Sequence, residues 1–205
     1  MSRPPREAQV RSEFKRSVAK HVIDVKLDNG PYRHIRFKSP GTISCYFDLV
    51  CWPGYLCFTG DMGTFVFARL TDMFEFFRQK ESATIDYRYW AEKCEAADRA
   101  SGLKEFSEDL FREAVRSDLD GMEACKELRE EVEDSVLSMA GEGEHEAIRA
   151  AMEFTWENKR VFQDFYEHSV RDYTYRFYWA CMAIVWGIAR YDEAKTGAVM
   201  AEGGG

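Results

Sequence analysis

The chain has 205 residues and the composition of a globular protein, with 45% hydrophobic and 31% charged residues. Its formal net charge of -8 argues against nucleic-acid binding by the chain as a whole, because such binding depends on neutralising phosphates. The longest apolar run, residues 177–189, is too short to span a bilayer, and the N-terminus lacks the apolar core of a secretory signal. These features predict a cytoplasmic protein without a membrane segment.

Charge is divided unevenly along the chain. Residues 1–40 hold ten Lys and Arg against four acids, whereas residues 105–146 are rich in Asp and Glu. We interpret residues 1–19 as a flexible basic arm, the one segment left open for contact with nucleic acid. The acidic helix predicted around residues 123–134 has two interpretations: a solvated helix face, or a surface that competes for a basic groove of another protein.

Residues 20–70 alternate apolar and polar side chains between short turns, a pattern typical of antiparallel strands. The hairpin signal Asp28-Asn29-Gly30-Pro31 separates the first two strands, and Gly-containing turns separate the next three. Five strands joined in this way predict an antiparallel β-meander. In the second strand the alternation divides the side chains between two faces, with Tyr32, His34, Arg36 and Lys38 on one and Arg33, Ile35 and Phe37 on the other.

Beyond residue 70 the spacing of apolar residues becomes helical. Thr71, Asp86 and Ser107 are placed as N-caps of three helices. Further helices are predicted near residues 122–140, 144–170 and 172–194. The last of these is apolar nearly all round, so we expect it to lie at the centre of the fold.

The predicted fold class is α+β, an N-terminal antiparallel β-meander packed against a C-terminal helical bundle. The β-meander covers residues 20–70 and the helical part residues 71–195, and both are expected to belong to one compact domain. Residues 196–205, which include three terminal glycines, are expected to form a flexible tail.

The six cysteines lack a metal-binding pattern. Cys45, Cys51 and Cys57 are spaced six residues apart, with no CxxC pair and no Cys/His cluster of zinc-finger spacing. A metal or redox site on neighbouring strands is one interpretation, and small buried hydrophobic residues in a reduced compartment are the other. We favour buried thiols, and we expect neither a metal nor a cofactor.

The candidate binding residues lie in the predicted sheet. The turn from Thr59 to Thr64 contains two glycines and Asp61, so backbone N–H groups could approach a ligand closely. The alternative is an ordinary hairpin turn in which Asp61 caps its own backbone. A second group would offer charge and aromatic surface to a nucleotide-like anionic ligand, and it comprises Arg33, His34, Arg36, Tyr46, Asp48, Trp52 and Arg69.

Asp48 stands among apolar neighbours, and a buried carboxylate there needs a partner such as Arg36 or Arg69. That pairing could be purely structural, and the face that carries it could be a solvated sheet surface. If Asp48, Asp61 and His34 converge in one pocket, they could instead serve a hydrolase acting on nucleotides or nucleic acids. The sequence carries no other catalytic signature.

Residues 39–77, SPGTISCYFDLVCWPGYLCFTGDMGTFVFARLTDMFEFF, resemble an uncharacterised family of bacteriophage and prophage hypothetical proteins. The segments DYRYWAEKC and YRFYWACMAIVWGIARYD resemble later blocks of the same family, so the resemblance covers most of residues 20–192. The markers WPG, GDMGT and DMFEFF occur in the family's order. The resemblance brings no catalytic residues and implies an accessory phage gene, whose product counters host defence or modulates host machinery.

The expected function is therefore non-enzymatic: a phage-encoded accessory protein that binds and neutralises a host immune component in the bacterial cytoplasm. It would be an anti-CRISPR protein or a protein that sequesters a nucleotide signal. The acidic helices favour a host defence protein as the partner, and the sheet face favours a nucleotide. The alternatives are the hydrolase described above and a phage structural or assembly protein, and a homo-oligomer stays open.

Overall fold

The computed structural model describes residues 6–80 and 83–202, with the backbone alone over 198–202. The chain divides into two compact units, unit 1 (Met1–Leu103 with Tyr173–Gly205) and unit 2 (Lys104–Asp172). This division differs from the single domain expected over residues 20–195. Each unit has its own hydrophobic core, because the C-terminal helix returns to the N-terminal sheet and residues 104–172 pack among themselves.

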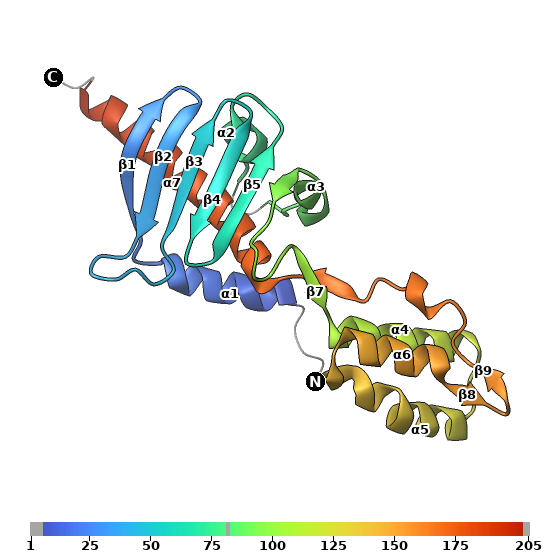
Figure 1. Cartoon of the computed structure of the whole chain (residues 1–205). Helices are drawn as coiled ribbons and strands as arrows, with labels where there is room; N and C mark the ends of the chain where they lie inside the picture. Colours follow the sequence, from blue (N-terminus) through green and yellow to red (C-terminus); the bar gives the residue numbers. More distant parts are fainter. Residues whose placement is uncertain (1–5, 81–82, 203–205) are drawn as a thin grey trace. The chain divides into compact units, whose positions relative to one another are not determined.

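Unit 1 is built on a six-stranded antiparallel sheet in which the strands follow their order in the sequence (Figure 1). The α+β class and the N-terminal antiparallel meander are thus confirmed. Five of the strands are those expected, and the sixth, β6, was not predicted. The strands are β1 (Val22–Asn29), β2 (Tyr32–Lys38), β3 (Phe47–Trp52), β4 (Tyr55–Gly60), β5 (Gly63–Ala68) and β6 (Cys94–Ala96).

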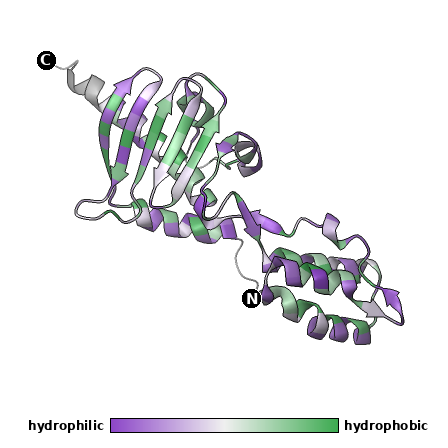
Figure 2. Cartoon of the chain, in the orientation of Figure 1, coloured by the Kyte–Doolittle hydropathy of each residue, from purple (hydrophilic) through white to green (hydrophobic). Residues whose placement is uncertain are grey.

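The register of the sheet separates an inner, apolar face from an outer one. Ile35 in β2 pairs with Leu49, Leu49 with Phe58, and Phe58 with Phe65, and all four side chains are fully buried. Hydrophilic and hydrophobic residues form bands along β1 and β2, whereas β4 and β5 are largely hydrophobic (Figure 2). Because successive side chains of a strand point to opposite faces of the sheet, the apolar residues of each strand face the core.

Helix α7 (Tyr175–Glu202) crosses the inner face of the sheet (Figure 1). Its buried side chains include Phe177, Trp179 and Ile184, in agreement with the central helix expected from its apolar sequence. The absence of a side chain at Gly187 permits close packing, since a Cβ there would lie 3.1 Å from both Leu49 and Phe37. The helix runs on to Glu202, so the tail expected from residue 196 is helical over its described part, and residues 203–205 lie outside the described residues.

Helix α1 (Arg6–Val18) occupies most of the segment expected to be a flexible arm. Val10, Phe14 and Val18 recur every four residues and are buried, and Phe14 meets Trp179 of α7 edge to face at 5.1 Å. This basic segment is therefore an amphipathic helix and not a mobile arm. Residues 1–5 lie outside the described residues.

Two short helices complete unit 1, α2 (Met73–Phe77) and α3 (Tyr87–Glu92). The N-cap of α2 is Asp72, which accepts a hydrogen bond from the Phe74 N–H, so the cap predicted at Thr71 was wrong by one residue. Asp86 caps α3 as predicted. Helix α3 ends at Glu92 because the chain then extends along the sheet as β6.

Unit 2 is a small helical unit. Its core holds Phe111, Val115, Val132 and Phe165, and Ser107 caps its first helix as predicted by accepting from the Leu110 N–H. The predicted helix over residues 144–170 was wrong beyond residue 153, where the chain forms a short hairpin and a 3₁₀ turn. The elements are β7 (Lys104–Phe106), α4 (Glu108–Gly121), α5 (Lys126–Ser135), η1 (Leu137–Glu142), α6 (Glu144–Glu153), β8 (Thr155–Trp156), β9 (Lys159–Arg160), η2 (Phe165–Glu167) and β10 (Arg171–Tyr173), with β7 paired to β10. Across the described part of the chain, no helix has the length and apolar character needed to cross a membrane.

Candidate functional site

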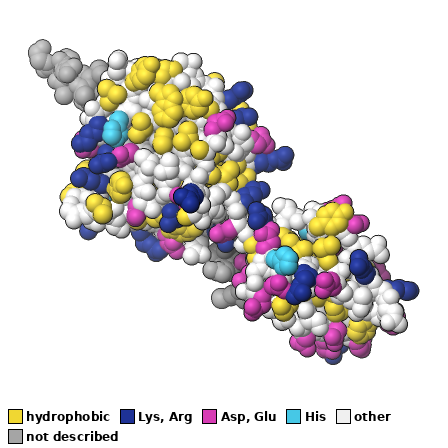
Figure 3. Space-filling model, in the orientation of Figure 1, with side chains coloured by type: hydrophobic (Ala, Val, Ile, Leu, Met, Phe, Trp, Pro, Cys, Tyr) yellow, Lys and Arg dark blue, Asp and Glu magenta, His cyan; other side chains and the backbone are white. Residues whose placement is uncertain are grey.

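The candidate site is the outer face of the sheet, which is turned toward the viewer in Figure 1 and bears none of the described helices of unit 1. Hydrophobic side chains gather on this face, with a histidine and several cations toward one side (Figure 3). Most of the residues singled out in the sequence lie here. The face divides into a polar row and an apolar patch.

The polar row crosses the sheet through directly paired residues. Asp24 pairs with Arg36, Arg36 with Asp48, Asp48 with Thr59, and Thr59 with Thr64. Arg36 donates from Nε and Nη2 to the two carboxylate oxygens of Asp48, both at 2.8 Å, while the hydroxyls of Thr59 and Thr64 lie 2.8 Å apart. Side-chain hydrogen bonds thus join two neighbouring pairs of this row, Arg36 with Asp48 and Thr59 with Thr64.

Asp48 is the centre of this row, and its side chain is only 7% exposed. Burial raises the pKa of its carboxyl group, but hydrogen bonds from Arg36 and from His34 Nε2, at 3.0 Å, outweigh burial and hold that pKa below its usual value. The carboxylate is therefore ionised and paired with a guanidinium. The Arg36 charge, which was expected to attract an anion, is neutralised within the protein.

Two further predicted residues lie around this pair. The Arg36 guanidinium carbon is 5.6 Å from the centroid of the Tyr46 ring, which is a cation–π contact. Arg69 follows β5 and is exposed, with its backbone N–H donating to the Gly54 carbonyl at 3.2 Å. Of the two partners proposed for Asp48, Arg36 is the one that binds it in the structure.

The outer apolar patch, as we call it, lies beside the polar row. Trp52 and Tyr55 stack on each other with ring centroids 5.2 Å apart and planes 17° from parallel, although each is more than a third exposed. Leu27 and Tyr32 are about half exposed. The members of the patch are Leu27, Tyr32, Val50, Trp52, Tyr55 and Val66, which the register places in neighbouring rows of β1 to β5.

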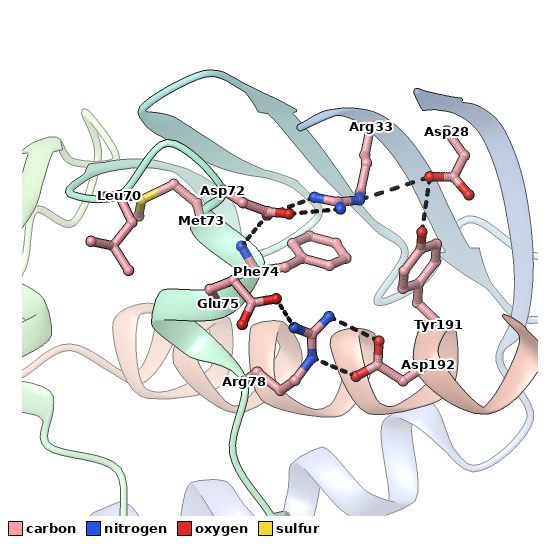
Figure 4. A network of polar contacts seen from close by, with 10 residues as sticks. All are labelled: Asp28, Arg33, Leu70, Asp72, Met73, Phe74, Glu75, Arg78, Tyr191 and Asp192. Atoms are coloured by element: carbon pink, nitrogen blue, oxygen red, sulfur yellow. Dashed lines mark hydrogen bonds and ion pairs between the residues drawn. The ribbon is translucent and has the colours of Figure 1, made fainter. Parts of the chain in front are cut away.

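Arg33 lies on the opposite, inner face, as the alternation in its strand predicts, and so apart from the other candidate residues. It donates from Nη1 and Nη2 to the carboxylate of Asp72 at 2.7 and 2.8 Å, and its guanidinium sits 4.6 Å from the centroid of the Phe74 ring (Figure 4). Asp72 raises the pKa of the Arg33 side chain above its usual range. Arg33 therefore anchors α2 to the sheet.

The same network reaches helix α7. Asp28 accepts a hydrogen bond from the Tyr191 hydroxyl at 2.8 Å and lies 3.8 Å from Arg33 Nε (Figure 4). Arg78, beyond the C-terminus of α2, donates to both carboxylate oxygens of Asp192 on α7 and also contacts Glu75. These contacts connect the sheet, α2 and α7, which is a structural role.

The turn from Gly60 to Gly63 is closed against a neighbouring loop. Asp61 accepts from the Cys45 N–H at 2.8 Å and donates from its own N–H to the Tyr46 carbonyl at 3.1 Å. Asp61 thus caps another segment, not its own backbone as the hairpin interpretation supposed. Because the carboxylate is engaged and the backbone of the turn packs on residues 45 and 46, the open binding loop is not the arrangement observed.

The residues proposed for hydrolysis are likewise engaged. His34 does lie beside Asp48, but both oxygens of that carboxylate accept from Arg36 or His34, and Asp61 is bound to the 45–46 loop. Neither carboxylate is positioned as a general base toward an open pocket. Within residues 6–80 and 83–202, no three or more His, Cys, Asp or Glu side chains come together to hold a metal ion.

The three evenly spaced thiols lie apart in the fold. Cys51 points to the buried inner face, Cys57 pairs with Val50 on the outer face, and Cys45 lies in the loop before β3. All six described thiols are free, and burial raises the pKa of Cys51 to about 12. Cys51 therefore behaves as a small hydrophobic residue.

Unit 2 carries most of the negative charge. It holds 20 Asp and Glu against nine Lys and Arg, a formal net charge of -11, so the rest of the chain is +3. The six acids that were predicted to lie on one helix are all exposed, and they are Glu123, Glu127, Glu130, Glu131, Glu133 and Asp134. Only the last five lie on α5, since Glu123 precedes it.

Sequence reasoning identified Trp52 but missed the other members of the outer apolar patch. The signal was present, because Tyr32, Trp52 and Tyr55 flank the two hairpin turns and alternate with inward residues. Assembling them into one surface required the strand register, which juxtaposes residues distant in the chain. Comparisons of the chain with protein-family models, with curated proteins and with solved structures found no match.

Proposed function

We propose that this protein is a non-enzymatic inhibitor that acts by binding another protein through the outer face of its sheet. The observation that carries this proposal is the outer apolar patch beside a self-neutralised polar row. Contiguous exposed apolar surface rimmed by polar residues is typical of interaction sites. Tyr and Trp are the residue types most enriched among those that dominate binding energy, and Trp52 and Tyr55 are already ordered by stacking.

A protein fits this face better than a nucleotide does. A nucleotide phosphate would have to displace Asp48 from Arg36, which breaks two charge-assisted hydrogen bonds. A protein can instead cover the aromatic pair and leave the salt bridge at the rim. The charge of -11 on unit 2 additionally favours a partner with a basic surface, because complementary charge speeds association.

The resemblance to phage and prophage proteins supplies the proposed setting. In that setting the partner is a component of a bacterial immune system, and the protein acts in the cytoplasm of the host cell. Inhibition would follow from occupation of a surface that the immune component needs. The proposal needs no catalytic group, in keeping with the engagement of Asp48 and Asp61 in the fold.

A plaque assay tests this function. Bacteria that carry individual, sequence-defined immune systems are infected with a sensitive phage, with and without expression of this protein. We expect the wild-type protein to restore plaques against at least one system by tenfold or more. The variant Trp52→Ser/Tyr55→Ser should lose that effect while keeping the wild-type circular dichroism spectrum and thermal midpoint, since both side chains are substantially exposed.

The matched control is Tyr166→Ser, which removes an aromatic side chain that is 62% exposed in unit 2 and should leave protection intact. Protection that survives the double substitution would refute the sheet face as the binding surface. No effect on any immune system, together with a large oligomer that the double substitution dissociates in light scattering, would instead indicate the phage assembly protein.

A further inference from the structure

A separate groove lies between α1, α7 and the segment before α3, within unit 1. It encloses about 390 Å³, in the range of about 300–1,000 Å³ typical of small-molecule sites. Its apolar walls are Phe14, Val18, Ile85, Met182 and Val185, all of them largely buried side chains of the core. The lining is thus shaped by residues that also hold the fold together.

The rim of the groove is cationic. Arg11 and Lys15 stand one turn apart on α1, and Arg190 approaches from α7. The described lining includes no Asp or Glu. Two of the cations have acidic neighbours outside the groove, since Arg11 binds Glu7 at 2.7 Å and Arg190 lies 3.1 Å from Glu193. Arg11 and Arg190 are therefore already ion-paired, whereas no described acidic residue pairs with Lys15, so Lys15 presents its positive charge above the apolar floor.

One wall of the groove is held rigidly. His21 is bonded through Nε2 to the Cys45 carbonyl at 2.9 Å and through Nδ1 to the Ser39 hydroxyl at 3.1 Å. Because a carbonyl oxygen only accepts, Nε2 carries a proton. Trp186 meets the His21 ring edge to face at 6.3 Å, and the Arg190 guanidinium lies 5.6 Å from the centroid of Trp186. These contacts pre-organise the groove, which lowers the cost of binding.

We propose that this groove binds a small amphipathic anion, with an alkyl chain against Phe14, Val18 and Met182 and an anionic head group between Arg11, Lys15 and Arg190. An apolar floor with cations confined to the rim matches a ligand that is apolar along its body and charged at one end. This site is separate from the outer face of the sheet, so the proposal of an anion site can be tested independently of the proposed inhibitory function.

Octanoate is the probe, and binding is measured by isothermal titration calorimetry on the full chain. Two comparison ligands separate the contributions of the alkyl chain and the charge of octanoate: 1-octanol has the chain without the charge, and acetate has the charge without the chain. We expect octanoate to bind at least tenfold more tightly than either. In protein labelled with ¹³C at the methionine methyl groups, the Met182 resonance should shift on addition of octanoate, while that of Met139 in unit 2 should not.

Two pairs of variants locate the site. Ala19 is exposed and lines the groove, so Ala19→Trp should obstruct it and weaken octanoate binding at least tenfold, whereas Gln9→Trp, at an exposed position of α1 outside the lining, should not. Lys15→Glu should weaken binding at least fivefold, whereas Lys126→Glu makes the same charge change on α5 without effect.

Several outcomes would overturn the proposal. One is the absence of measurable octanoate binding at millimolar concentration. Another is octanoate affinity that is unchanged by Ala19→Trp or by Lys15→Glu in folded protein. Equal affinity for 1-octanol would show that the rim cations do not select an anion. A loss of plaque protection without a loss of octanoate binding would concern the inhibitory function alone.

Discussion

Arg36 and Asp48 face each other across the β2–β3 pair and share two parallel hydrogen bonds of 2.8 Å. The carboxylate is nearly buried and the guanidinium is 37% exposed, so the pair joins the core of the sheet to its surface. A slip of one residue between these strands would direct Asp48 into the apolar inner face. The pair therefore contributes to the register of the sheet as well as to its charge balance.

Replacement of Asp48 by asparagine should destabilise the protein by about 1–2 kcal/mol, because charge-assisted bonds to Arg36 are lost while the side-chain shape is kept. Urea denaturation measures this free energy of unfolding. Asp24→Asn is the control, since the Asp24–Lys26 ion pair is well exposed and should contribute less than about 0.5 kcal/mol. Equal losses in the two variants would contradict a special role for Asp48.

The contribution of Asp48 to stability should also depend on pH. Its pKa is lower in the folded protein than in the unfolded chain, where it is about 3.9. The stabilisation is therefore complete above the unfolded pKa and is lost as pH falls through the folded pKa. The difference in unfolding free energy between wild type and Asp48→Asn should be largest near pH 6 and should shrink below pH 4. A difference independent of pH would contradict the assignment.

Gly60 has no room for a side chain. Its φ is +152°, and a Cβ would lie 2.3 Å from the Tyr46 carbonyl oxygen and 2.8 Å from the Phe47 Cα. Gly60→Ala should therefore lower the free energy of unfolding by more than about 3 kcal/mol or prevent folding. Gly30→Ala is the control, because Gly30 also has a positive φ but no atom near its Cβ position, and it should cost only about 1 kcal/mol.

Arg33→Ala should destabilise unit 1 by about 3 kcal/mol, since it leaves the partly buried carboxylate of Asp72 without its bidentate cation, whereas Asp28 keeps Lys195 at 2.8 Å. Urea denaturation again measures the effect. Arg33→Lys should recover less than half of the loss, because an ammonium group cannot make the two parallel bonds to Asp72 or stack on Phe74. Full recovery with lysine would mean that charge alone matters at this position.

The thiols should react in an order set by burial. Among the described cysteines, only Cys125 is exposed, whereas Cys51 and Cys181 are buried with raised pKa values, and burial raises the pKa of Cys94 to about 11. At pH 8, Ellman's reagent should label Cys125 rapidly and the buried pair only on unfolding. Cys125→Ser should remove the fast phase. A fast phase that persists in this variant would contradict the observed packing.

The β-meander and several helix ends could be predicted because their signals are local. Alternation in β2 correctly separated Arg33 from Arg36, and the caps at Asp86 and Ser107 depend on side-chain to backbone contacts within three residues. Helix α1 was not predicted, because its signal is not local. Its apolar row of Val10, Phe14 and Val18 is short and surrounded by charge, and its stability comes from packing against α7.

By itself the sequence determined the α+β class, the five-strand meander and the central place of α7, because periodicity and turn chemistry act over a few neighbouring residues. Only the tertiary structure decided that residues 104–172 form a unit of their own and that Asp48 pairs with Arg36. It also decided that Trp52 and Tyr55 share a surface with Leu27 and Val66. These features depend on strand register and on long-range packing, which join residues that no local pattern connects.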